Sequence, residues 1–119
     1  MQRFLLKSKI HRARITDANV DYEGSISIPL DLMEATGLWE GEKVLVASIT
    51  SGNRLETYVQ TGSAGTGQIV INGGAAHRIG SGERVTIMAF TLSEGPVTSR
   101  RIVCDEINRI VAGPRDTDR

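Results

Sequence analysis

Gly24-Ser25 lies at a predicted junction of loop and strand, and the Ser25 hydroxyl is a potential nucleophile. A serine hydrolase that pairs Ser25 with His11 or His77 is conceivable, but the sequence around Ser25 lacks a nucleophile elbow. Taken alone, Gly-Ser at a predicted junction of loop and strand is most often an ordinary turn.

Metal and phosphate chemistry find little support in the sequence. The two histidines and the single distant cysteine, Cys104, lack the spacing of a metal site, and one cysteine permits no intramolecular disulfide. The glycine-rich segment 62–67 lacks the Gly-Lys-Ser/Thr ending of a phosphate-binding loop. We therefore expect no metal ligands, and we interpret segment 62–67 as a flexible hairpin loop.

Short strands must position the groups named above. Residues 5–16 alternate polar and apolar, which predicts a strand with Lys7, Lys9, His11 and Ala13 on one face. The other predicted strands share flanking Gly, Asn, Ser or Pro residues, and they span 25–28, 43–49, 55–60, 68–72, 84–91 and 101–104. Residues 51–53 are typical of a hairpin turn.

One short helix is expected at Leu32–Thr36, with Asp31 as its N-cap, Glu34 completing a capping box and Gly37 as its stop. Many short strands and almost no helix predict an all-β protein folded as a small closed barrel, because closure removes exposed strand edges.

Two six-residue segments match in residue type and lie 41 residues apart. Gly41-Glu42-Lys43-Val44-Leu45-Val46 and Gly82-Glu83-Arg84-Val85-Thr86-Ile87 each join a Gly-Glu turn to an apolar strand. The match suggests two equivalent halves wound into one barrel, although Gly-Glu-Lys/Arg-Val is common before any strand.

Composition limits the size and class of the protein. A chain of 119 residues with 39% hydrophobic content fits one domain, residues 1–119. The 14 basic and 14 acidic residues give no overall positive charge for nucleic-acid binding, and 4% aromatic content leaves few rings for stacking on bases. No apolar run approaches the roughly 18 residues of a membrane span. We interpret the protein as soluble and cytoplasmic, with a flexible polar tail at 113–119.

Four sequence blocks, in order and at matching spacing, carry a family resemblance. They are Lys9-Ile10-His11-Arg12, Asp21-Tyr22-Glu23-Gly24-Ser25, Arg54-Leu55-Glu56-Thr57-Tyr58 and Asn72-Gly73-Gly74-Ala75-Ala76-His77. Together, from the N-terminus to about residue 112, they resemble the aspartate 1-decarboxylases, pyruvoyl-dependent enzymes that make β-alanine for pantothenate synthesis. The resemblance implies a six-stranded double-psi β-barrel with one or two short helices.

The resemblance also implies how the cofactor arises. Decarboxylation at the α-carbon of an amino acid needs an electron sink. In this family the chain cuts itself before a serine and converts that serine to a pyruvoyl group, whose ketone forms a Schiff base with the substrate. The matching step here is Gly24-Ser25, which implies self-cleavage into chains 1–24 and 25–119.

Further residues acquire expected roles from the resemblance. Lys9 and Arg54 would bind the carboxylates of L-aspartate, because charge-assisted hydrogen bonds to carboxylates are strong. Tyr58 would return a proton to carbon after CO2 leaves, and Thr57 would assist cleavage at Gly24 and then contact substrate. The substrate loop would be formed by Asn72, Gly73, Gly74 and Ala75. His11 and Tyr22 would line the site.

Two expectations concern assembly. Consecutive strand residues point to opposite faces, so Thr57 and Tyr58 cannot both face one pocket of one barrel. A site shared between subunits would resolve this, and family members are tetramers of cleaved protomers. Maturation either occurs spontaneously or needs a helper protein.

The chain departs from the family pattern at several positions. Relatives commonly have Ala, Asn and a larger residue where this chain has Gly74, Ser51 and Ala47, and branched apolar residues where it has Gln60 and Thr86. These changes imply a roomier or more polar pocket. A pyruvoyl enzyme acting on another small acidic amino acid is therefore one alternative.

A second alternative is not an enzyme. Residues 28–30 followed by 37–44 resemble the strand-Pro-helix-Gly-x-x-Gly-Glu-Lys-Val signature of swapped-hairpin DNA-binding regulators, and the basic N-terminal run could contact phosphates. Those modules are shorter and do not require the blocks at residues 24–25, 57–58 or 72–73. The balanced net charge also disfavours this alternative, so we expect no nucleic acid and no membrane among the partners.

Overall fold

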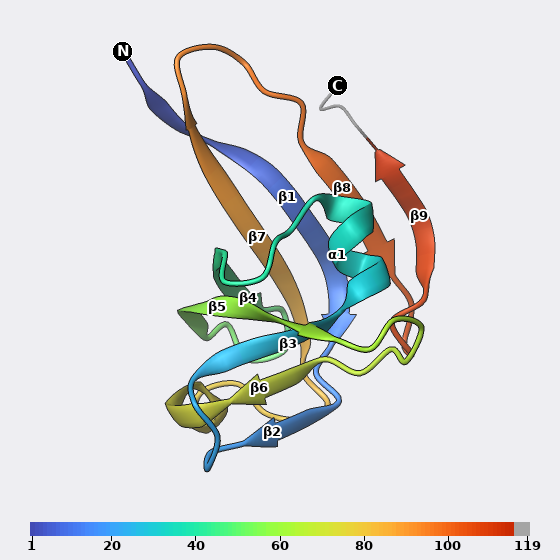
Figure 1. The fold of residues 1–119 in the computed structure, drawn as a ribbon. Helices are drawn as coiled ribbons and strands as arrows, with labels where there is room; N and C mark the ends of the chain where they lie inside the picture. Colours follow the sequence, from blue (N-terminus) through green and yellow to red (C-terminus); the bar gives the residue numbers. More distant parts are fainter. Residues whose placement is uncertain (116–119) are drawn as a thin grey trace.

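The computed structural model describes residues 1–115, and strands dominate it (Figure 1). The elements, in chain order, are β1 (Arg3–Arg14), β2 (Asp17–Asn19), β3 (Ser25–Pro29), α1 (Leu30–Thr36), β4 (Lys43–Ser48), β5 (Arg54–Gly62), β6 (Val70–Asn72), the 3₁₀ helix η1 (Gly73–His77), β7 (Arg84–Ser93), β8 (Arg100–Cys104) and β9 (Ile110–Arg115). Within residues 1–115, no helix is both long and apolar enough to cross a membrane.

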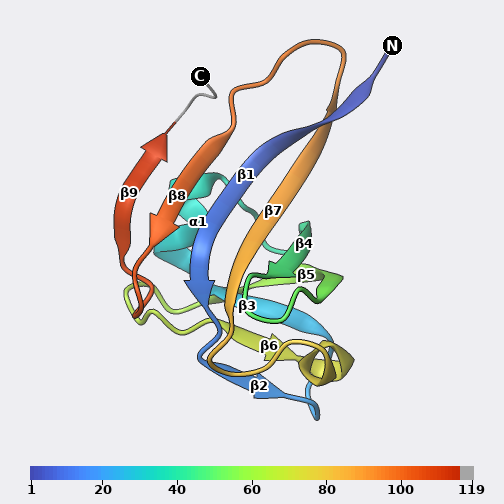
Figure 2. The same ribbon diagram turned by 180° about the vertical axis from the view of Figure 1, so that it is seen from behind.

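The strands form one sheet in the order β2-β6-β3-β5-β4-β7-β1-β8-β9. Only Ile15 and Thr16 separate β1 from β2, and these two residues continue both ladders. The Ile15 N–H donates to the Glu83 carbonyl (2.9 Å), and the Thr16 N–H donates to the Ile69 carbonyl (2.8 Å). The continuous segment formed by β1 and β2 thereby closes the sheet on itself. With β1 and β2 counted as one strand, the barrel has six strands, which confirms the expected closed six-stranded barrel. Figure 2 shows β8 beside β1 and β9 beside β8, and these two strands are not part of the closed barrel.

The two Gly-Glu turns occupy equivalent places in the barrel. Each turn exchanges two backbone hydrogen bonds with one residue of a neighbouring segment. In the first turn, the Gly41 N–H donates to the Val59 carbonyl (2.8 Å) and the Val59 N–H donates to the Glu42 carbonyl (2.9 Å). In the second turn, the Gly82 N–H donates to the Ile15 carbonyl (2.7 Å) and the Ile15 N–H donates to the Glu83 carbonyl (2.9 Å). The strands that follow, β4 and β7, pair antiparallel with Val46 opposite Ile87, which are themselves 41 residues apart. This repetition supports the two-halved, double-psi barrel.

Branched apolar side chains fill the interior of the barrel. Ile10, Ile87 and Val46 lie side by side across β1, β7 and β4, and all three are fully buried. Alternation along each strand therefore places the intervening residues on the outer face. Because the interior is packed, side chains that bind a substrate must lie outside the barrel or at its ends.

The helix begins earlier than the sequence predicts, and the expected N-cap is wrong. Pro29 takes the cap position, and α1 starts at Leu30, since proline already supplies a backbone angle suited to entering a helix. The Asp31 carboxylate instead accepts a hydrogen bond from the Gly65 N–H at 2.9 Å. The expected stop at Gly37 is confirmed, with φ of 76° in the left-handed region.

Two strands and one connection differ from expectation. The segment 62–67 is not a hairpin loop, because β5 and β6 both pair with β3 and lie on opposite sides of it. The three-residue β2 and the strand β9 were not predicted. Of the tail that the sequence predicts to be flexible, residues 113–115 belong to β9, which pairs with β8, and residues 116–119 lie outside the described residues.

Candidate active site

The outer face of β1 and β5 presents four of the sequence-predicted site residues. Lys9 and His11 flank the inward-facing Ile10 on β1, and Arg54 and Tyr58 occupy outward positions on β5. Strands β7 and β4 lie between β1 and β5 in the sheet. The four side chains therefore share one surface of the sheet but do not form one compact cluster within the protomer.

The predicted face of β1 needs one correction. Ala13 is fully buried in the core instead of sharing the outer face with Lys9 and His11. The register of β1 against β7 shifts between Ile10 and Ala13, and Arg12 in that interval has φ of 63°. This β-bulge inserts an extra residue, so the alternation that holds before it reverses after it. Lys7 is engaged elsewhere, by the Gly37 carbonyl and the Glu42 carboxylate.

Ser25 lies at the start of β3 with its side chain buried and hydrogen-bonded. It pairs with Asn72 of the antiparallel strand β6. The Asn72 amide Nδ2 donates to Ser25 Oγ at 3.0 Å, and Ser25 Oγ donates to Gln60 Oε1 of β5 at 2.9 Å. Two strands that flank β3 therefore hold the one hydroxyl that the sequence singled out.

The backbone of Gly73 lies directly against Gly24. A Cβ atom at Gly73 would stand 2.6 Å from the Gly24 Cα, 2.7 Å from the Gly24 nitrogen and 3.0 Å from the Tyr22 carbonyl oxygen. Gly73 also has φ of 76°, which disfavours any other residue. The predicted substrate loop thus brings its first glycine onto the residue before Ser25, while the Tyr22 side chain is exposed.

The remainder of the predicted substrate loop forms the start of η1. Asn72 ends β6 and Gly73 begins the 3₁₀ helix, with Gly74 exposed and Ala75 half-buried. The first N–H groups of a helix lack acceptors within the helix. The first N–H groups of the segment Gly73–Ala75 therefore have no acceptor within η1, and the predicted role of this segment in binding substrate stays a prediction.

Thr57 and Tyr58 face opposite sides of β5. Val59 is buried beside Ile26 of β3, and Thr57, two residues earlier, has the same inward orientation and is half-buried. Tyr58 is 42% exposed and shares the outward side with Gln60. Ile26 of β3 pairs with Val59 of β5. The residues just before them, Ser25 and Tyr58, therefore occupy neighbouring positions on the outward side of the sheet.

Sequence reasoning missed Gln60 as a contact of Ser25. The available signal was its polarity at a position where the resemblance favours a branched apolar residue. Thr86 carries the same signal, and its hydroxyl lies 3.2 Å from Nδ1 of His11. Both polar departures therefore contact residues of the predicted site.

The surroundings of His11 lower its pKa and so favour the neutral form. Burial lowers its pKa below the usual 6.5, and the positive charges of Lys9, Arg12 and Arg84 lower the pKa further. The neutral ring has one donor and one acceptor nitrogen, which suits the contact with the Thr86 hydroxyl.

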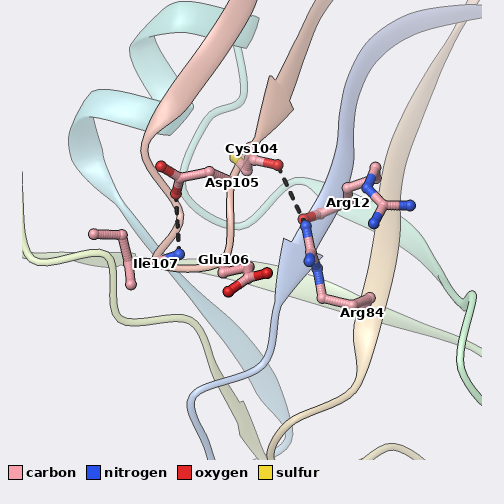
Figure 3. Close-up of a pocket in the computed structure, with 6 residues that line it drawn as sticks. All are labelled: Arg12, Arg84, Cys104, Asp105, Glu106 and Ile107. Carbon is pink, nitrogen blue, oxygen red and sulfur yellow. Dashed lines mark hydrogen bonds between the residues drawn. The ribbon is translucent and has the colours of Figure 1, made fainter.

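A separate cavity of about 460 Å³ lies where β1, β7 and β8 meet (Figure 3). Arg84 extends across it and donates to the carbonyl oxygens of Arg12 and Cys104, which ties three strands together. The residues lining the cavity include none of the predicted site residues. Within residues 1–115, no group of three His, Cys, Asp or Glu side chains is placed to hold a metal ion.

The fold is that of a small closed β-barrel protein, in which the buried Ser25 is hydrogen-bonded by Asn72 and the exposed Gly24 lies against Gly73. Comparison with known proteins identifies the family. Residues 1–111 match the aspartate decarboxylase family, and the chain belongs to that family.

Individual relatives agree with this assignment. The aspartate 1-decarboxylase of Corynebacterium efficiens is 55% identical over 116 residues, which cover 94% of this chain and 85% of the relative. That of Thermotoga sp. strain RQ2 is 49% identical over 93% of this chain and 97% of the relative. That of Myxococcus xanthus is 47% identical over 95% of this chain and 90% of the relative.

The contact between Gly73 and Gly24 gives a testable prediction. We expect Gly73→Ala to lower the free energy of unfolding by at least about 2 kcal/mol, because the methyl group overlaps the Gly24 backbone and φ is positive. Urea unfolding of the purified variants measures the effect. Gly74→Ala is the matched control, since a Cβ there meets no atom within 4 Å. Equal stabilities for the two variants would contradict the contact.

The lowered pKa of His11 predicts a pH dependence of stability. Below about pH 6.5 the unfolded chain binds a proton at His11 more readily than the folded chain, so the contribution of His11 to stability is present above that pH and is lost on acidification. We expect wild type to lose more unfolding free energy than His11→Asn between about pH 7.5 and about pH 5.5. Equal losses in urea titrations would argue against a lowered pKa.

Proposed function

We propose that this chain is a pyruvoyl-dependent enzyme that decarboxylates L-aspartate to β-alanine and CO2 for pantothenate biosynthesis. The observation that carries the proposal is membership of the aspartate decarboxylase family across residues 1–111. The same membership favours an enzyme over a DNA-binding regulator. L-Aspartate is the first candidate among small acidic amino acids because the relatives are aspartate 1-decarboxylases.

Self-cleavage between Gly24 and Ser25 would generate the working enzyme. The Ser25 hydroxyl attacks the Gly24 carbonyl carbon, and the acyl group moves from nitrogen to oxygen. Elimination then removes the Ser25 Cα proton and expels the Gly24 carboxylate, and water replaces the remaining nitrogen as ammonia to leave a ketone. The products are chains 1–24 and 25–119, and the larger chain starts with the pyruvoyl group.

The strand register supports a role for Thr57 in the first step. The paired residues Ile26 and Val59 lie two positions after Gly24 and Thr57, so continuation of the register sets Thr57 beside the Gly24 peptide. A hydroxyl there can donate to the oxyanion that forms on the Gly24 carbonyl oxygen during attack.

The residues around Ser25 fit a small carbonyl group at that position. Asn72 is nearly fully buried, and within residues 1–115 its Oδ1 has no hydrogen-bond partner. Gly73 adds no Cβ to the space, and Asn72 Nδ2, which donates to the Ser25 hydroxyl oxygen, would donate to a carbonyl oxygen in its place. The pyruvoyl group supplies an electron sink for the pair of electrons released when CO2 departs.

The other site residues bind substrate and move a proton. Lys9 and Arg54 bind the two carboxylates of L-aspartate, and the backbone N–H groups of Gly73, Gly74 and Ala75 approach one of them. The Tyr58 hydroxyl gives its proton to the substrate carbon that lost CO2. His11 and Tyr22 line the site.

Assembly would complete the site. Lys9 and Tyr58 lie on an outer face that also exposes large apolar side chains, and these are Phe4, Phe90 and Leu92. Such a face is typical of a surface covered by a partner. We propose a homotetramer in which each active site combines residues of two protomers, located in the cytoplasm, with a maturation helper as an optional partner.

Intact mass spectrometry tests the proposal. We expect the mature protein to give two chains, 1–24 and 25–119, the larger without a free N-terminal amine, and to release β-alanine and CO2 from L-aspartate. Ser25→Ala removes the attacking hydroxyl, so it should remain one folded, inactive chain. A wild-type protein that stays a single chain with no carbonyl trappable by borohydride and substrate would refute the proposal.

Tyr58→Phe separates cleavage from turnover. The variant keeps the ring but lacks the proton, so we expect normal cleavage at Gly24-Ser25 and a kcat lowered by about 100-fold. Chain composition by mass and the rate of β-alanine formation are the two measurements. An unchanged kcat would remove Tyr58 as the proton donor.

A further inference from the structure

Gln60 contacts the hydroxyl that must react first. It lies on β5, two residues after Tyr58, and its exposed side chain reaches across to the buried Ser25. The distance between Ser25 Oγ and Gln60 Oε1 is 2.9 Å, within the range of a good O–H···O hydrogen bond.

The hydrogen-bond pattern fixes the direction of the Ser25 proton. A serine hydroxyl has one proton and two lone pairs. Asn72 Nδ2 donates to one lone pair at 3.0 Å. The two acceptors within reach are Gln60 Oε1 at 2.9 Å and the Glu23 carbonyl oxygen at 3.4 Å, and the shorter contact to Gln60 takes the proton. One lone pair on Oγ remains for attack.

We propose that Gln60 is a positioning residue that accelerates self-cleavage of this chain by accepting a hydrogen bond from the Ser25 hydroxyl. The inference rests on the proposed function, since it concerns the self-cleavage described there. It adds a residue to which the proposed function gave no role.

The acceleration follows from charge development during attack. As the Ser25 Oγ–C bond to Gly24 forms, the hydroxyl oxygen gains positive charge and its proton becomes more acidic. The hydrogen bond to Gln60 Oε1 therefore strengthens between the ground state and the transition state, which is the condition for a contact to raise a rate. Over the complete step the Gly24 C–N bond breaks, the C–O bond forms, and the hydroxyl proton ends on the freed Ser25 amine.

The test compares cleavage rates of freshly purified full-length precursors. Gln60→Leu and Gln60→Met remove a strong acceptor, and we expect them to cleave about threefold to tenfold more slowly than wild type, the range expected for one neutral hydrogen bond. Gln60→Glu keeps an acceptor oxygen at the same reach and should restore the wild-type rate or exceed it. Gln68→Leu, the same change at another exposed glutamine, is the matched control.

Intact mass against time gives the rate constants, and thermal unfolding of each precursor in a Ser25→Ala background reports on the fold. A purely structural role would lower the unfolding temperature of Gln60→Leu and would not be rescued by Gln60→Glu. Wild-type rates in both Gln60→Leu and Gln60→Met, or a Gln60→Glu rate as low as that of Gln60→Leu, would overturn the inference while the proposed function stands. A wild-type chain that never cleaves would overturn both.

Discussion

The close approach of two backbone segments, at Gly24 and Gly73, is the constraint on which the arrangement of the site depends. Contact at this distance is possible because Gly73 has no Cβ, whereas a Cβ at Gly24 would meet no atom within 4 Å. It lets β6 pair with β3 up to the first residue of β3, so that Asn72 lies opposite Ser25 and can bond its hydroxyl. Without that approach, the segment before Ser25 would lose its packing partner, and the hydroxyl would lose its fixed orientation.

The closed barrel determines where the other functional groups lie. Its interior is filled by branched apolar side chains such as Ile10, Val46 and Ile87, which leaves no room for a substrate. Lys9 and Tyr58 therefore occupy the outer face, several strands apart and next to exposed apolar side chains. A site of this kind needs a second surface to exclude water, so on the proposed function catalysis and assembly depend on each other.

Alternation and turn residues were sufficient to predict most of the fold, because each barrel strand has one buried face. They failed where a local feature breaks the period or where pairing is long-range. The bulge at Arg12 reversed the orientation of Ala13, and the three residues of β2 are too few to show a period. The segment 62–67 has a hairpin composition, yet β5 and β6 pair with β3 and not with each other, which local sequence does not encode.

The candidate site, like the fold, could be predicted from the sequence only in part. Short blocks located Gly24, Ser25 and Gly73, because backbone chemistry and close approach demand particular residue types. The role of Gln60 could not be predicted, because its contact with Ser25 depends on the parallel register of β3 and β5. The buried Asn72 adds a further constraint, since its Oδ1 has no hydrogen-bond partner among residues 1–115 and an unpaired buried acceptor costs free energy. On the proposed function, self-cleavage consumes the hydroxyl that Asn72 and Gln60 now bind. The polar atoms around Ser25 must therefore serve two successive occupants: Asn72 Nδ2 donates to the hydroxyl in the first state and can donate to a carbonyl oxygen in the second.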